Sequence, residues 1–229
     1  MMTLFLTTLL KPDTYVWLLM ALMAVLSIGV LMLWIFGRRK WLKWICTFVV
    51  VLGWYILLYG TYVGVARIEV RQVEFSSKDL PEAFDGYRIV QFSDAHVGTM
   101  TGSRQWLLQR AVDSINALKP DVIVFTGDLQ NLHPEELEEH QAVLRQLRAK
   151  DGVISVLGNH DYPTYLDCDE ATKEDLLRQT IDFERALGWK LLLNEHRIIR
   201  RDSDSIVIAG MENWGKPKRM PRRGDVAKT

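Results

Sequence analysis

The stretch Arg88-Ile-Val-Gln-Phe92, followed directly by Ser93-Asp94-Ala95-His96, decides how this 229-residue chain is expected to fold. A short, mostly apolar run that ends in polar residues is typical of a buried strand that stops at a functional loop. Since ligands bind at the carboxyl edge of an open parallel sheet, several such runs would gather their polar residues at one edge. The arrangement occurs twice more, in Asp121-Val-Ile-Val-Phe125 before Thr126-Gly127-Asp128 and in Gly152-Val-Ile-Ser-Val-Leu157 before Gly158-Asn159-His160-Asp161.

Side chains able to bind a metal ion are concentrated in these polar runs. Residues two apart in an extended chain point to the same side, so Asp94 and His96 can bind one ion together. The Asp128 carboxylate can bridge two ions through its two oxygens, and Asn159 offers an amide oxygen to the second. Mixed oxygen and nitrogen ligands favour manganese, iron or zinc over calcium. We therefore predict a metal site built from Asp94, His96, Asp128 and Asn159.

In this order, Asp94-x-His96, Gly127-Asp128 and Gly158-Asn159-His160-Asp161 resemble the motifs of the calcineurin-like metallophosphoesterase family. The resemblance runs from about Tyr87 to Trp214. Each motif alone is compatible with an ordinary turn, because Gly, Asn and Asp favour turns, but three in order behind apolar strands are specific. The resemblance implies an α/β fold, the αββα sandwich, of which the last strands would be absent. It also implies hydrolysis of a phosphate ester or pyrophosphate by an activated water at two divalent ions.

The resemblance further implies that His160 is catalytic: it would lie over the substrate and stabilise charge or protonate the leaving oxygen, without binding metal. Asp161 is expected to orient and charge that imidazole. The alternative for His160 is a structural capping role. His133 precedes Pro134 and two glutamates that fit a first helical turn, so we expect it at a helix start. Because it closely follows Asp128, contact with the substrate is the alternative.

The remaining histidines bear on the completeness of the site. We expect His140 on a solvated helix face and His196 in a structural hairpin, and no histidine follows His196. The family pattern continues with a further metal-binding His and a Gly-His-x-His run. We therefore interpret the chain as a C-terminally incomplete copy of the family domain. The alternative function is a non-catalytic membrane-anchored protein that binds a metal or a partner.

Two uncharged segments near the N-terminus predict membrane helices. Thr14–Phe36 and Trp44–Ala66 each contain 23 residues, and a bilayer core requires about 20 apolar residues per helix. Gly37–Lys43 between them carries four positive charges, and positive loops stay cytoplasmic. This predicts a multi-pass integral membrane protein whose phosphoesterase domain is extracytoplasmic, unless an upstream span inverts the topology. The expected partners are membrane lipids and a phosphorylated small-molecule or lipid substrate.

The organisation follows from these segments. Residues 1–66 form the membrane anchor, 67–86 a linker with an edge strand over the alternating Ile68–Phe75, and 87–229 the partial phosphoesterase domain. Within that domain strands alternate with helices, which implies a parallel sheet. Apolar stripes predict helices over Leu107–Leu118, Leu137–Leu147 and Leu176–Leu187, and the strands of a second sheet are expected at Lys190–Leu193, Arg197–Arg200 and Ser205–Gly210.

Charge is distributed unevenly although the net charge is zero. Residues 72–196 contain twelve basic and twenty-two acidic side chains. An acidic domain suits a cation site and argues against nucleic-acid binding, which requires a basic surface. The basic segment Lys216–Arg223 could contact anionic headgroups or a substrate phosphate, with a solvated loop as the alternative.

Overall fold

The computed structural model describes residues 12–215 and 220–229. The chain divides into two units, Met1–Val70 and Arg71–Thr229. Half of the expected basic segment Lys216–Arg223, residues 216–219, lies outside the described residues.

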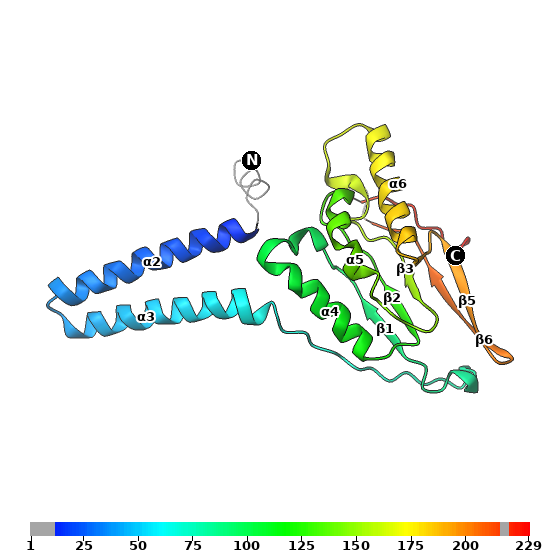
Figure 1. Cartoon of the computed structure of the whole chain (residues 1–229), viewed down its shortest axis with the longest axis horizontal. Coiled ribbons are helices and arrows are strands. Elements are labelled where there is room, and N and C mark those ends of the chain that lie inside the picture. The colour runs from blue at the N-terminus through cyan, green and yellow to red at the C-terminus, as the bar shows by residue number, and fades with distance from the viewer. Residues whose placement is uncertain (1–11, 216–219) are drawn as a thin grey trace. The chain divides into compact units, whose positions relative to one another are not determined.

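The first unit is a hairpin of two antiparallel helices, α2 (Pro12–Phe36) and α3 (Lys40–Leu58), and α3 continues into a π-helical turn at Tyr59–Gly64 (Figure 1). Two tryptophans hold the helices together. The Trp34 indole donates to Thr47 Oγ1 at 2.9 Å, and the Trp54 indole donates to Ser27 Oγ at 3.0 Å. By length and composition, Thr14–Phe36 and Lys40–Gly64 are long and apolar enough to cross a membrane.

The second unit is built on a parallel sheet in the order β1-β2-β3-β4. Phe92 pairs with Phe125 and Phe125 with Ser155, so the first three strands end level with one another. The three apolar runs therefore form neighbouring strands, as predicted. The strands are β1 (Ile89–Phe92), β2 (Val122–Phe125), β3 (Val153–Ser155) and β4 (Lys190–Leu191), connected by helices α4 (Gln105–Ala117), α5 (Gln141–Leu144) and α6 (Glu170–Ala186).

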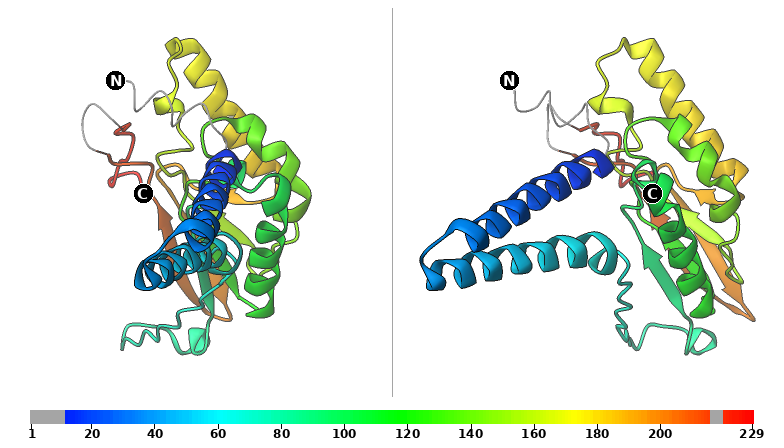
Figure 2. Two further views of the ribbon diagram at one scale, coloured as in Figure 1. Left: turned by 90° about the vertical axis from the view of Figure 1, so that its left-hand side faces the viewer. Right: turned by 60° about the vertical axis from the view of Figure 1, so that its left-hand side comes forward.

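Apolar residues cover both faces of this sheet, as a buried parallel sheet requires. On β2, Ile123 and Phe125 pack toward the helices with Leu108 of α4, because alternate residues of a strand point to opposite faces. On the other face Val122 packs with Ile199 of an antiparallel hairpin, β5 (Glu195–Arg201) and β6 (Asp204–Gly210). Figure 2 shows helices α4, α5 and α6 on one side of the parallel sheet and the β5–β6 hairpin on the other, so the second unit has three layers.

Two details of the sequence prediction are wrong. Lys190–Leu193 was expected in the second sheet, but β4 pairs in parallel with β3, since α6 acts as the crossover that returns the chain alongside it. Ile68–Phe75 is not one of the described strands, and Val73 is 86% exposed and Phe75 77% exposed. A segment of alternating apolar and polar residues forms a strand only where a neighbouring strand can pair with it.

Candidate metal centre

The loops that follow β1 and β2 run side by side beyond the sheet. The Asp94 N–H donates to the Gly127 carbonyl at 2.9 Å, and the His96 N–H donates to the Asp128 carbonyl at 3.1 Å. Asp94, His96 and Asp128 all have positive φ, at 53°, 42° and 62°. Left-handed backbone is disfavoured for residues with a side chain, and such strain is concentrated at functional sites.

Glycine brings the loop after β3 against these two. Gly127 has φ +97°, and a Cβ added to it would lie 2.2 Å from the Gly158 nitrogen. A Cβ added to Gly158 would in turn lie 2.5 Å from the Asp128 nitrogen. The two backbones touch, so neither position can accept a side chain without movement of the loops.

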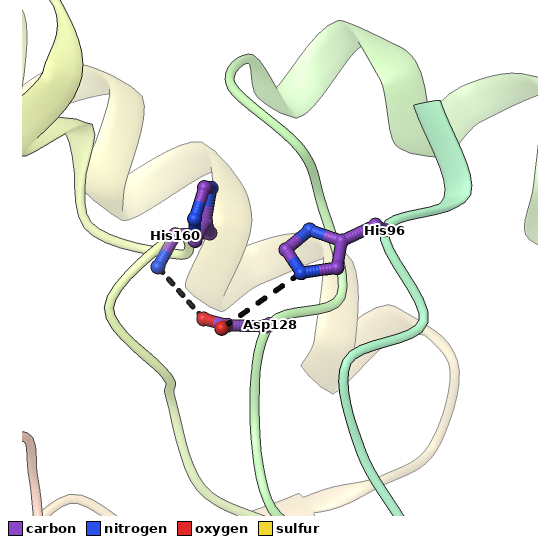
Figure 3. A group of neighbouring side chains, drawn as sticks. All are labelled: His96, Asp128 and His160. Carbon is purple, nitrogen blue, oxygen red and sulfur yellow. Dashed lines mark hydrogen bonds and ion pairs between the residues drawn. The ribbon is translucent and has the colours of Figure 1, made fainter. Parts of the chain in front are cut away.

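The three loops bring His96, Asp128 and His160 into one cluster, with potential ligand atoms all within 4.8 Å of one another (Figure 3). His96 Nε2 lies 4.0 Å from Asp128 Oδ2 and 4.0 Å from Asp94 Oδ1. The other oxygen of Asp128 accepts the His160 backbone N–H at 2.7 Å. The imidazoles of His96 and His160 meet edge to face, with centroids 4.7 Å apart. Two predicted ligands, His96 and Asp128, thus lie together, with Asp94 beside them.

The cluster suits a divalent cation. In the part of the chain that the structure describes, the ion-pair partner of Asp94 and of Asp128 is His96, and no lysine or arginine neutralises either carboxylate. His96 Nδ1 is buried and has no hydrogen-bond partner among these residues. Carboxylate oxygens and imidazole nitrogens together are the donor set of manganese, iron and zinc sites. Two carboxylates without a lysine or arginine partner, both facing His96 Nε2 at 4.0 Å, are the kind of donor group that such an ion would neutralise.

His160 is oriented by a backbone group. Its Nδ1 lies 2.7 Å from the Asn131 carbonyl oxygen. A carbonyl can only accept, so Nδ1 carries the hydrogen and Nε2 is the nitrogen left to bind or transfer a proton. The expectation that Asp161 orients this imidazole is wrong, because Asn131 performs that role.

Asp161 instead fastens two of the loops together. Its fully buried carboxylate accepts backbone N–H groups from Gly158 at 2.8 Å, Asp128 at 2.7 Å and Leu129 at 2.8 Å, and a longer one from Gln130 at 3.3 Å. Burial raises the pKa of Asp161, and these N–H groups oppose that rise. The residue therefore fixes the backbone of Asp128 in the geometry of the cluster.

Comparison with known proteins agrees with this geometry. A model of the calcineurin-like phosphoesterase family matches residues 87–226. The chain belongs to the calcineurin-like phosphoesterase family. Divalent-metal dependence is general for this family.

Several curated relatives resemble the chain over part of their length. An uncharacterized metallophosphoesterase of Bacillus subtilis is 40% identical over 110 residues, covering 47% of this chain and 37% of the relative. A zebrafish (Danio rerio) transmembrane protein with a metallophosphoesterase domain is 33% identical over 161 residues, covering 69% and 34%. The UDP-2,3-diacylglucosamine pyrophosphatase of Chlamydia trachomatis is 39% identical over 95 residues, covering 40% and 28%. The chain thus spans about a third of the length of these relatives. No solved structure matches it significantly.

Helix α6 contacts the loops of the cluster through buried polar groups that the sequence interpretation missed. Ser155 Oγ donates to Glu184 Oε2 at 2.6 Å, and Thr180 Oγ1 donates to Gln130 Oε1 at 3.0 Å. Gln130 in turn donates to the His160 carbonyl at 3.2 Å. Burial raises the pKa of Glu184 well above its usual range, and the charge of Asp161 raises it further. The available signal was a polar pair at helical spacing, Thr180 and Glu184, on the buried face of α6.

Two further predicted site residues are Asn159 and His133. Asn159 directly precedes His160 of the cluster, and its amide Nδ2 donates to the Tyr165 hydroxyl at 2.9 Å. His133 precedes the 3-10 helix Pro134–His140, as expected, and its imidazole lies 3.9 Å from Glu135. It is not part of the cluster.

His140 is buried, and the expectation of a solvated face is wrong. The segment Pro134–His140 is a 3-10 helix with three residues per turn, so Pro134, Leu137 and His140 align on one buried face. An α-helical period would have separated them. Burial lowers the pKa of His140, which favours the neutral imidazole beneath the loop that carries His96.

Proposed function

We propose that this chain is a membrane-anchored, metal-dependent phosphoesterase that hydrolyses a phosphate ester or pyrophosphate. The observation that carries the proposal is the cluster of His96, Asp128 and His160 at the carboxyl ends of the sheet. Its carboxylate is not neutralised by any lysine or arginine among the described residues. Family membership makes phosphoester hydrolysis the chemistry that such a cluster serves.

Asp94, His96, Asp128 and Asn159 would hold the metal, and two manganese, iron or zinc ions fit their oxygen and nitrogen donors. Such ions, when bound, supply Lewis acidity toward phosphate oxygens and lower the pKa of water. The backbone hydrogen bonds between the first two loops hold His96 and Asp128 in place before any ligand arrives. His160, with Nδ1–H directed at the Asn131 carbonyl, presents Nε2 to the leaving oxygen and would donate a proton to it from the doubly protonated imidazolium.

The substrate we propose is a lipid-linked phosphate or pyrophosphate. Two apolar helices in the same chain would keep the domain at a bilayer, where a tether raises the local concentration of membrane substrates. The Chlamydia relative is named for a pyrophosphatase that acts on a diacylated sugar nucleotide. The positive loop Gly37–Lys43 favours a cytoplasmic turn between two spans, which would place the phosphoesterase domain outside the cytoplasm.

The metal site is tested on the full chain in detergent. We expect calorimetric Mn²⁺ binding and hydrolysis of p-nitrophenyl phosphate or its bis-ester. Asp128→Asn should weaken Mn²⁺ binding at least about 100-fold, because it removes the charged member of the cluster. Asp113→Asn, on the exposed surface of α4, is the matched control and should behave as wild type. Equal Mn²⁺ affinity in wild type and Asp128→Asn would reject the proposed site.

The lipid substrate is tested separately. Hydrolysis of a diacylated pyrophosphate in mixed micelles is compared with hydrolysis of a soluble diester at equal bulk concentration. A preference of about tenfold or more for the lipid is expected from the local-concentration argument. Equal rates for the two substrates would reject the lipid proposal while leaving the phosphoesterase proposal intact.

A further inference from the structure

The chain turns back on itself immediately after the Gly158–Asp161 motif. Pro163–Tyr165 forms one turn of 3-10 helix with proline in its first position, where a missing N–H costs nothing. The Thr164 N–H donates to the Tyr162 carbonyl at 2.8 Å, which tightens the turn. This turn places Tyr165 against the motif that precedes it in the sequence.

Tyr165 makes two contacts with that motif. Its hydroxyl accepts a hydrogen bond from Asn159 Nδ2 at 2.9 Å. Its ring stacks on the His160 imidazole, with centroids 4.7 Å apart and planes inclined by 26°. The Asn131 carbonyl binds the same imidazole at its edge, through Nδ1. His160 is thus held on one face by Tyr165 and at one edge by Asn131.

The contact with Asn159 gives the NH₂ group of its amide a partner. An asparagine amide has one acceptor oxygen and one NH₂ group, which point in opposite directions. An amide that gives its oxygen to a cation must place its NH₂ group against an acceptor. In the structure the Tyr165 hydroxyl oxygen is that acceptor, and Asn159 Oδ1 is the amide atom left for a cation. Partners of this kind, one shell out from the ligands, set ligand orientation and metal affinity.

We propose that Tyr165 is a positioning residue for the metal centre: its hydroxyl orients the Asn159 amide and its ring holds the His160 imidazole. The inference rests on the proposed function, because it treats Asn159 as a metal ligand. Tyr165 acts through these two residues and has no role in the reacting bonds.

The test compares three variants of the full chain in detergent. Tyr165→Phe removes the hydroxyl and keeps the stacked ring, whereas Tyr165→Leu removes both. Tyr87→Phe is the matched control: it removes a tyrosine hydrogen bond of 2.7 Å to Asp151, at the opposite end of the strands. The measurements are the Mn²⁺ dissociation constant by calorimetry, the NMR signals of the Asn159 side-chain NH₂ group without metal, and the melting temperature.

We expect Tyr165→Phe to shift the Asn159 NH₂ signals and to weaken Mn²⁺ binding about tenfold, with no change in melting temperature. Tyr165→Leu should weaken it further, and Tyr87→Phe should leave the Mn²⁺ affinity and the Asn159 signals as in wild type. Wild-type Mn²⁺ affinity and unmoved NH₂ signals in Tyr165→Phe would overturn the inference. An equal loss of affinity in Tyr87→Phe would also overturn it, because the effect would then be general.

The two proposals fail in different ways. If the wild-type chain itself bound no Mn²⁺, the proposed function and the positioning role would both be rejected. If the wild-type chain bound Mn²⁺ and Tyr165→Phe bound it equally well, only the role of Tyr165 would be rejected.

Discussion

The two ends of the parallel sheet use aspartate in opposite ways. At the amino end, Asp121 opens β2 with only 8% of its side chain exposed, and cations surround it. Lys150 Nζ lies 2.7 Å and Arg201 Nη2 lies 2.9 Å from its Oδ1, while the Arg88 N–H donates to Oδ2 at 2.7 Å. Burial alone would raise the pKa of Asp121, but these hydrogen bonds outweigh it and lower the pKa to about 2.

At the carboxyl end, Asp128 lies in the loop after the same strand, without a lysine or arginine among the described ion pairs. Its backbone has positive φ, as do those of Asp94 and His96, and its ion-pair partner is an imidazole. Charges at the amino end are thus neutralised within the fold and contribute to stability. The charges at the carboxyl end remain available to a ligand. The strained backbone there is held by hydrogen bonds to buried groups such as the Asp161 carboxylate.

The strongest test of this contrast is Asp161→Asn. The amide would direct NH₂ hydrogens at backbone N–H groups that now point at a carboxylate. Leaving those donors buried and unpaired should reduce the free energy of unfolding by about 4 kcal/mol and eliminate Mn²⁺ binding. Urea unfolding of the full chain in detergent, beside the exposed Asp113→Asn, measures the loss. A change below about 1 kcal/mol would mean that Asp161 does not support the carboxyl end.

Alanine substitutions at two glycines compare how closely other atoms approach the backbone at the two ends of the sheet. Gly158→Ala places a Cβ 2.5 Å from the Asp128 nitrogen, so the loops must separate. A cost of about 3 kcal/mol and a loss of Mn²⁺ affinity are expected. Gly152, at the amino end of β3, has φ +84° but nothing within 4 Å of an added Cβ. Gly152→Ala should cost about 1 kcal/mol from backbone strain alone and bind Mn²⁺ normally. Equal costs for the two variants would contradict the described crowding.

Asp121→Asn tests the amino end. The pKa of Asp121 is lowered, so its contribution to stability is present above the unfolded pKa of 3.8 and is lost as pH falls toward about 2. At pH 7 the variant should be less stable by about 2 kcal/mol, since one pKa unit corresponds to about 1.4 kcal/mol. The difference should vanish near pH 2, and Mn²⁺ affinity at pH 7 should be unchanged. Weaker Mn²⁺ binding in this variant would show that the two ends are not separate.

What the sequence predicted well is local. Apolar runs identified β1, β2 and β3, and the polar residues directly after them identified the loops of the site, because strand and ligand are adjacent in the chain. The long uncharged segments identified α2 and α3 for the same reason. Asp94, His96 and Asp128 could therefore be placed together from the sequence.

What it missed depends on partners distant in the chain or on a change of helical period. The period of the Pro134–His140 helix determines that His140 is buried. Asp161 was assigned to its sequence neighbour His160, but its hydrogen bonds go mainly to the loop after β2. Glu184 and Thr180 were omitted from the stripe on α6 because only apolar residues were counted. The partners of Asp161 follow from tertiary contacts that residue spacing does not encode, whereas the spacing of Thr180 and Glu184 was a usable signal.

Glu184→Gln is expected to give the smallest effect. It replaces a buried carboxyl that has no lysine or arginine partner among the described ion pairs. The pKa of Glu184 is raised by burial and by Asp161, so the folded protein keeps a proton that the unfolded chain releases above about pH 4.5. Its contribution to stability is therefore full below that pH and decreases as pH rises toward the folded pKa. Wild type should lose about 1 kcal/mol more than Glu184→Gln between pH 5 and pH 6, because glutamine reproduces the neutral carboxyl beside Ser155. Urea unfolding at the two pH values measures this, with exposed Glu138→Gln as control. If the free energy of unfolding depended on pH identically in wild type and Glu184→Gln, Glu184 would be ionised in the folded protein. The carboxyl end of the sheet would then stabilise a buried charge, as the amino end does.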